Sequence, residues 1–313
     1  MAPAPGRRDV LRTLIGSAAA LSLPIALPRR ARAQSASALE SIPLSNTVTL
    51  VTGAGGNVVV VTSDDGIAMI NGGLKEHGKQ LSETVSELGA GRPVRYLFNT
   101  DWHPEHSGSN ETLGRAGAQI IAHENTKQYL GEDIFVDWQH RTYKALPKVA
   151  LPTRTSYGAD KMTFGRERME FGPLGQAHTD GDIFVFLPQS NVLVTGDVLA
   201  VGAYPMADYV SGGWLGGLMT ATKTLLDLTN DETRVVPGVG AVQTRADIKI
   251  QHDMLVTLRE RLHQMMRKGM SSRDMLSAGA TKEFDARCGD PSLFLSVTYR
   301  GMWLHVRELG GIV

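Results

Sequence analysis

The chain has 313 residues, of which 42% are hydrophobic and 20% are charged, a composition typical of a globular protein with a sizeable core. Its 32 basic and 32 acidic side chains balance, so the composition gives no electrostatic basis for binding nucleic acid. The single cysteine, Cys288, excludes an internal disulfide, and we interpret it as a small buried hydrophobic residue.

The first 33 residues have the pattern of an export signal. Arg7 and Arg8 precede an uncharged run, Thr13 to Leu27, that is too short to span a hydrocarbon core of about 30 Å. A small-x-small cleavage site, Ala31-Arg32-Ala33, follows. The paired arginines resemble a twin-arginine signal, and a general secretory signal is the alternative. We therefore expect removal of residues 1–33 and a periplasmic mature protein, residues 34–313, without a membrane anchor.

The mature sequence alternates between strand and helix patterns. Residues 46–72 contain β-rich runs separated by Gly-rich and Asp-Asp-Gly turns, which indicate hairpins. A helical stripe follows (Leu74, Leu81, Val85 and Leu88), and the apolar run 94–98 predicts a buried strand. Next come a short helix from about Glu111, a strand ending at His123 and a helix from about Glu124.

The second half of the sequence predicts a strand meander followed by helices. The strand-like runs are 161–171, 181–188 and 191–200, and the helical region carries an apolar stripe at Leu255, Leu258, Leu262 and Met265. No internal repeat is visible, so one compact α/β domain is the expected organisation.

The residues that follow the buried strand 94–98 have the chemistry of a metal site. Asp101-x-His103-x-Glu105-His106 places four polar side chains in six residues. Histidine and carboxylate are the ligands that hydrolytic metals prefer, and a loop at a strand end directs several side chains to one point. Taken alone, this stretch also fits an ordinary polar loop.

Three later motifs accompany it. His178 precedes a β-run in the pattern His178-Thr-x-Gly-Asp182, Asp197 ends the strand "NVLVTG", and Pro237-Gly238 forms a turn after "RVV". The order and spacing of the four motifs resemble the metallo-β-lactamase superfamily of metal-dependent hydrolases, over essentially the whole mature chain.

The resemblance implies a single domain with the four-layer αββα metallo-β-lactamase sandwich and a C-terminal helical segment. It also implies two metal sites, the first comprising Asp101, His103 and His178, and the second comprising Glu105, His106 and the shared Asp197. The sequence departs from the family pattern at three positions. Asp101 stands in place of a histidine, Glu105 in place of an aspartate, and Val239 in place of the last histidine, and valine cannot bind a metal.

Together with the export signal, the resemblance implies an exported hydrolase that cleaves an ester, lactone, amide or similar bond of a small molecule by metal-activated water, with Asp197 and Glu105 as catalytic residues. We expect one or two zinc ions, and the carboxylate-rich ligand set also suits Mn or Fe. The alternatives are a catalytically degenerate metal- or ligand-binding protein and an iron-dependent oxidoreductase. The sequence does not predict the oligomeric state.

Other polar and aromatic residues have weaker signals. Tyr204 and Trp214 follow Asp197 where the family places substrate-facing loops, so substrate contact and loop packing are equal alternatives. His123 is a candidate for the outer shell of the site, and His252 is a less favoured replacement for the ligand missing at Val239. Asp182 is expected to orient a ligand or to cap the next strand.

Overall fold

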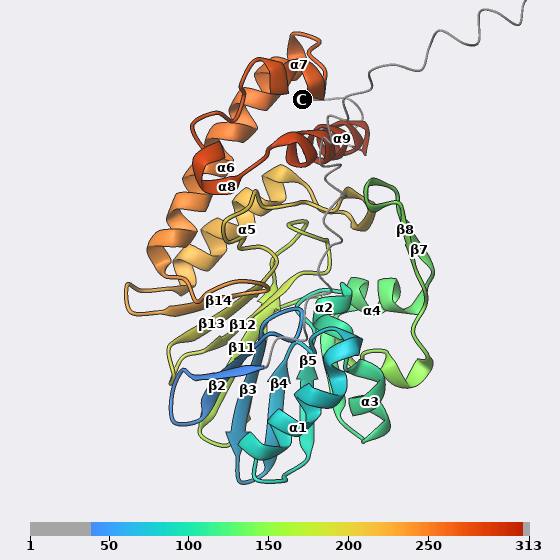
Figure 1. Cartoon of the computed structure of the whole chain (residues 1–313), viewed down its shortest axis with the longest axis vertical. Coiled ribbons are helices and arrows are strands. Elements are labelled where there is room, and N and C mark those ends of the chain that lie inside the picture. The colour runs from blue at the N-terminus through green and yellow to red at the C-terminus, as the bar shows by residue number, and fades with distance from the viewer. Residues whose placement is uncertain (1–38, 309–313) are drawn as a thin grey trace, which may run out of the picture. The chain divides into compact units, whose positions relative to one another are not determined.

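The computed structural model describes residues 39–308, which form two β-sheets and the helices that cover them (Figure 1). The residues expected to form the export signal lie outside this range. The first sheet has the strand order β1-β2-β3-β4-β5-β6-β9. Its strands are β1 (Glu40–Pro43), β2 (Val48–Thr52), β3 (Val58–Ser63), β4 (Gly66–Ile70), β5 (Val94–Phe98), β6 (Gln119–His123) and β9 (Arg154–Ser156).

The second sheet has the order β10-β11-β12-β13-β14. Its strands are β10 (Asp160–Phe164), β11 (Glu167–Pro173), β12 (Ile183–Leu187), β13 (Val192–Gly196) and β14 (Arg234–Pro237). Each sheet begins with antiparallel hairpins and continues with parallel strands: β4, β5, β6 and β9 in the first, β13 and β14 in the second. A separate two-stranded hairpin joins β7 (Ile134–Val136) to β8 (Arg141–Tyr143).

The side chains of the strands alternate between two apolar clusters, as the twofold periodicity of a strand requires. In β3, Val59 and Val61 face the second sheet, while Val58 and Val60 face the helices outside. The cluster between the sheets also contains Phe98 and other side chains from strands of both sheets. Val58, Val59, Val60 and Val61 are all fully buried. Because both faces of the strands are covered, their sequences are nearly continuous apolar runs.

Helices cover the outer face of each sheet and complete the αββα order. α1 (Gly78–Leu88) and α3 (Asn110–Arg115) pack on the first sheet, and α5 (Leu215–Leu228) and α6 (Arg245–Arg267) on the second. Thr244 and Asp247 form a capping box that begins α6. The remaining helices are α2 (Pro104–Ser107), α4 (Glu124–Gly131), α7 (Ser272–Ser277), α8 (Asp285–Cys288) and α9 (Ser292–Glu308), with one-turn helices η1 (Lys75–His77), η2 (Asp137–Gln139), η3 (Lys148–Ala150) and η4 (Tyr209–Ser211).

The structure agrees with the predicted hairpins, the buried strand 94–98, the meander and the C-terminal helices. It adds β1, the β7–β8 hairpin and β9, which the sequence patterns did not indicate. Leu74, counted in the helical stripe, lies before α1. Cys288 is buried, as expected. Within residues 39–308, no helix is both long and apolar enough to cross a membrane.

Candidate metal centre

The candidate ligands lie where strands of both sheets end. Asp101 follows β5 by three residues, and Asp197 directly follows β13. His178 lies in the loop between β11 and β12, and Pro237 ends β14. β4 and β5 run parallel, as do β13 and β14, so their carboxyl ends collect at one edge of each sheet.

Buried amides hold the segment that carries the first four ligands. The side-chain oxygen of Asn71 accepts hydrogen bonds from the backbone and the hydroxyl of Thr100, each at 3.0 Å. Asn99 and Asn110 exchange two amide hydrogen bonds, of 3.0 and 2.8 Å, and Asn99 also donates to the carbonyl of His106. These contacts fix α2 relative to the end of β5.

Four candidate ligands form a first group with donor atoms that face one another. Nδ1 of His103 lies 3.0 Å from Oδ1 of Asp101 and 3.3 Å from Nε2 of His178. Nε2 of His178 lies 3.6 Å from Oδ2 of Asp197. Two donors bound to one ion at about 2.0–2.1 Å with tetrahedral geometry lie roughly 3.3 Å apart. The first group therefore has the dimensions of a metal site.

A second group consists of Glu105, His106 and Asp197, whose donor atoms lie within 4.8 Å of one another. Nε2 of His106 lies 3.3 Å from Oδ1 of Asp197, so the two oxygens of Asp197 face different groups. The structure thus brings together the six residues named from the sequence, and it divides them into groups that share Asp197.

Buried polar atoms without partners show that the site fits a cation. Oδ2 of Asp101, Nε2 of His103 and both ring nitrogens of His106 have no hydrogen-bond partner within the described part of the chain. An unsatisfied buried polar atom is costly, and native structures contain few of them. An ion at the site would satisfy Oδ2 of Asp101 and Nε2 of His106, the His106 nitrogen that faces Asp101 and Asp197. The nitrogen and oxygen donor set suits Zn, Mn or Fe.

One loop sets the orientation of both histidines of the first group. Nδ1 of His178 lies 2.8 Å from the carbonyl of Met206, so the Nδ1 proton is donated there and Nε2 remains free for a metal. Nε2 of His103 faces Oδ2 of Asp208 at 3.7 Å, which leaves Nδ1 as the metal-facing atom. Asp208 is fully buried and accepts hydrogen bonds from Trp138 (2.9 Å) and Ser211 (2.7 Å). No sequence pattern indicated a role for Met206 or Asp208 at this site.

Asp182 orients the loop that carries His178, as expected. Its Oδ2 accepts hydrogen bonds from the backbone of His178 at 2.6 Å and of Thr179 at 3.0 Å. Burial raises the pKa of Asp182 to about 7, against the opposing effect of His178.

The charges of the candidate ligands are strongly coupled. Burial alone would raise the pKa of Asp101, but His106 and the other histidines outweigh it and hold that pKa well below its usual range. Burial would lower the pKa of His106, but Asp101 and Asp197 raise it to about 10. Burial would raise the pKa of Asp197, and His106 reverses the shift. This set of donors therefore has a strong affinity for positive charge, either protons or a metal.

The turn after β14 approaches the second group with its backbone. A Cβ atom on Gly238 would lie 2.0 Å from Oδ1 of Asp197 and 2.9 Å from Cε1 of His106, so a side chain there would displace the ligands. Val239, where the resemblance places the missing histidine, is 55% exposed. Hydrogen bonds from Asn57 to the carbonyls of Pro237 and Gly240 hold this turn.

Tyr204 is a packing residue. It is 5% exposed, its ring stacks on Phe294 with centroids 4.7 Å apart, and its hydroxyl donates to Asp285 at 2.7 Å. These contacts correspond to the packing alternative and not to substrate contact. Trp214 precedes α5 and stacks on His305 of α9 at 3.6 Å, so the structure gives its ring a packing partner too.

The two histidines considered as extra ligands have other partners. Nδ1 of His123 accepts a hydrogen bond from the backbone of Asn125 at the start of α4, and its ring contacts Tyr157. His252 lies on α6, with Nδ1 at 3.0 Å from the hydroxyl of Thr222 on α5. Neither residue belongs to the two ligand groups.

Comparisons with known proteins agree with this architecture. A metallo-β-lactamase from Pontibacter korlensis is 20% identical, with a TM-score of 0.56 over 70% of this chain and 99% of that one. The metallo-β-lactamase DIM-1 is 16% identical, with a TM-score of 0.57 over 70% of this chain and 97% of that one. The sec-alkylsulfatase Pisa1 from Pseudomonas sp. is 16% identical, with a TM-score of 0.64 over 88% of this chain and 51% of that one.

At these identities the solved structures show a shared fold, and the family model gives the assignment. The model of the metallo-β-lactamase superfamily matches residues 51–239, more than half of the sequence and all six candidate ligands. The chain belongs to the metallo-β-lactamase superfamily.

Proposed function

We propose that this protein is a metal-dependent hydrolase that cleaves an ester, lactone, amide or similar bond of a small molecule. The observation that carries the proposal is the pair of ligand groups that share Asp197, at the carboxyl ends of strands from both sheets. A divalent ion held by these residues would supply Lewis acidity and activate water for attack.

The exposure of the ligands supports distinct roles for them. The side chains of His103 and His178 are 5% and 8% exposed, whereas that of Asp197 is 19% exposed. Glu105 is also only partly buried. Asp197 and Glu105 thus stand nearest to solvent, where substrate arrives, and their carboxylates would orient the attacking water and accept its proton. We assign a catalytic role to Asp197 and Glu105 in addition to metal binding, and metal binding alone to the buried histidines.

The substrate class is best sought with a panel of hydrolysable bonds. The sec-alkylsulfatase structure covers a larger share of this chain than the two β-lactamases do, which supports adding a secondary alkyl sulfate to the panel. The panel would contain 4-nitrophenyl acetate, a γ-lactone, a β-lactam and that sulfate. The purified mature protein would be loaded separately with Zn, Mn and Fe.

The matched variants for this assay are His178→Ala and His252→Ala. Loss of His178 removes a first-group ligand, so we expect bound metal and activity to fall at least about tenfold. His252→Ala removes only a contact between α5 and α6 and should retain both. Equal metal content in the two variants would refute the ligand assignment. Tight metal binding by a wild type inactive on the whole panel would instead identify a degenerate metal-binding protein.

We further propose that the protein is exported to the periplasm by the twin-arginine pathway. The support is the sequence of residues 7–33: paired arginines, a short uncharged run and a small-x-small site. Replacing both Arg7 and Arg8 by lysine should trap the precursor inside the cell, as detected by fractionation. Normal export of that double variant would show that another route is used.

A further inference from the structure

A cavity of about 320 Å³ lies beside α2 and α3, within the size range of small-molecule sites. These helices line it with Pro104, Ser107, Gly108 and Glu111. This spacing puts all four residues on one helix face, since Gly108 and Ser109 continue the right-handed helical backbone between α2 and α3. Glu105 and His106 lie on the other faces, so the helical segment separates the cavity from these two candidate ligands.

The cavity has an aromatic wall that it shares with the metal centre. Trp102, Tyr129 and Tyr143 line it, together with Leu130 and Leu146. The rings of Trp102 and Tyr143 meet edge to face, with centroids 5.2 Å apart. Trp102 also stacks on His103 at 4.2 Å. Trp102 is 3% exposed and supports the wall from behind, whereas Tyr129 and Tyr143 are only partly buried. A planar apolar group would find the preformed rings of these two tyrosines here, at a low cost in side-chain ordering.

The charges of the lining favour an anion at one position. Lys75 is paired with Glu111 at 3.3 Å, and Lys144 with Asp133 at 2.6 Å. Arg141 takes part in no ion pair among residues 39–308, and its guanidinium lies over the ring of Tyr143, 4.6 Å from the centroid. Stacking on the wall orients the guanidinium for a bidentate contact with a carboxylate. Glu76, in η1, is the other charged lining residue without an ion pair among residues 39–308. Its carboxylate does not stack on an aromatic ring as the guanidinium of Arg141 does.

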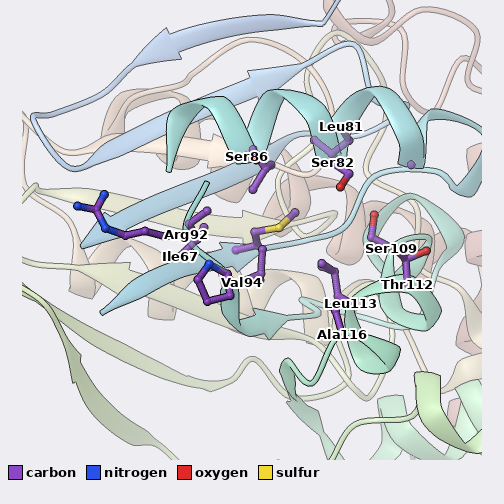
Figure 2. Close-up of a pocket in the computed structure, with 14 residues that line it drawn as sticks. Ile67, Leu81, Ser82, Ser86, Arg92, Val94, Ser109, Thr112, Leu113 and Ala116 are labelled. Carbon is purple, nitrogen blue, oxygen red and sulfur yellow. The ribbon is translucent and has the colours of Figure 1, made fainter. Parts of the chain in front are cut away.

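Another pocket of the protein lacks this combination of an aromatic wall and an unpaired cation. Figure 2 shows this pocket, of about 220 Å³, between α1 and α3, with Leu81, Val94 and Leu113 as part of its lining. Its one cation, Arg92, already contacts Asp64 at 3.4 Å and the carbonyl of Gly89. It has no aromatic wall.

We propose that the cavity between α2, α3, α4 and β8 binds a small aromatic carboxylate, with the ring against Tyr129 and Tyr143 and the carboxylate on Arg141. This site is separate from the candidate metal centre and does not depend on the proposed hydrolysis.

Calorimetric titration with three probes of similar shape tests the proposal: 1-naphthylacetate, its neutral amide and the cation 1-naphthylmethylamine. The wild type should bind the carboxylate at least about tenfold more tightly than the amide, the equivalent of about 1.4 kcal/mol. Arg141→Gln should abolish this preference, whereas Arg273→Gln, an exposed arginine on α7, should retain it. Equal affinity for carboxylate and amide would overturn the proposal, and so would a preference for the amine, since Glu76 would then be the determinant.

The same titrations must distinguish the cavity from the metal centre, which would also attract a carboxylate. We expect binding to persist in metal-free protein and in the His178→Ala variant. Binding that requires added zinc, or that is lost in His178→Ala while Arg141→Gln has no effect, would place the probe on the metal and overturn the proposal.

Discussion

Oδ2 of Asp101 lies 3.4 Å from Nε2 of His106, while its Oδ1 lies 3.0 Å from Nδ1 of His103. One carboxylate therefore faces both ligand groups. The histidine usual at this position in the family would offer a single nitrogen to a single ion. The aspartate places a second oxygen toward the second group, Glu105, His106 and Asp197, which lacks the histidine usual at position 239.

This geometry predicts that Asp101→Asn weakens the binding of both ions. The amide keeps the shape of the side chain but removes its charge and leaves only one oxygen, so each affinity should fall at least about tenfold. Glu105→Gln, which alters only the second group, is the matched comparison and should weaken one ion alone. Calorimetric titration of metal-free protein separates the two, and an Asp101→Asn variant that weakens a single ion would contradict the bridging position.

A second prediction concerns Asp208, which faces the far nitrogen of His103. Asp208→Asn keeps hydrogen-bond partners for Trp138 and Ser211 but removes the charge that favours a proton on Nε2. Metal affinity should fall about 10–100-fold, as is usual when the outer partner of a ligating histidine is removed. Trp138→Phe, which removes only the donor to Asp208, should cause a smaller loss.

The readout for these variants is the absorption spectrum of the Co²⁺-loaded protein together with metal affinity. A purely structural role of Asp208 would lower thermal stability without changing the spectrum. Unchanged affinity and spectrum in Asp208→Asn would show that this carboxylate does not position His103.

The raised pKa of His106 predicts that metal binding releases protons. Burial would lower this pKa, but Asp101 and Asp197 raise it to about 10, so the ring is protonated at pH 7 in the metal-free protein. A metal binds only the neutral imidazole. Affinity should therefore rise with pH, about tenfold per unit for each proton released, until the pH approaches about 10.

Calorimetry at pH 7 in two buffers of different ionisation enthalpy measures the released protons. At least about one proton per protein is expected from His106. Identical apparent enthalpies in the two buffers would mean that no proton is released and that His106 is already neutral.

The last prediction tests the missing histidine. Val239→His should increase affinity for the second ion, since imidazole would join Glu105, His106 and Asp197. The substitution costs little, because Val239 is 55% exposed. The variant should also gain metal-dependent thermal stability, because an ion that binds only the folded state stabilises it. A wild type that binds two ions tightly, with no gain in the variant, would show that the carboxylate-rich set is complete without residue 239.

Local sequence patterns predicted much of this architecture, because the spacing of apolar residues determines which faces of a strand or helix are buried. The unbroken run of valines from Val58 to Val61 places apolar side chains on both faces of a strand, so both faces must be covered. A strand end followed by His and carboxylate side chains indicates a metal site. The superfamily resemblance added the pairing of motifs more than 70 residues apart, as with His103 and His178.

Contacts made by irregular segments could not be predicted in this way. Asp208 reaches His103 from a loop, and nothing in "MADYV" distinguishes a buried carboxylate from a surface one. Tyr204 was ambiguous for the same reason, since an aromatic residue after a ligand fits a substrate loop and a packed loop equally well. The β7–β8 hairpin was missed because each of its strands is only three residues long.

The candidate ligands lie next to strands of both sheets: His103 and His106 follow β5 of the first sheet, whereas His178 lies between β11 and β12 and Asp197 follows β13 in the second. An ion held by His103 and His178 would therefore act as a reversible cross-link closing a loop of 75 residues. In the chain-entropy model, a covalent link over such a loop contributes about 4.5 kcal/mol to stability. A disulfide across a loop of this length would have a comparable effect, but the sequence has only one cysteine and cannot form one internally. A chelator would thus act on this protein as a reducing agent acts on a disulfide-bonded one.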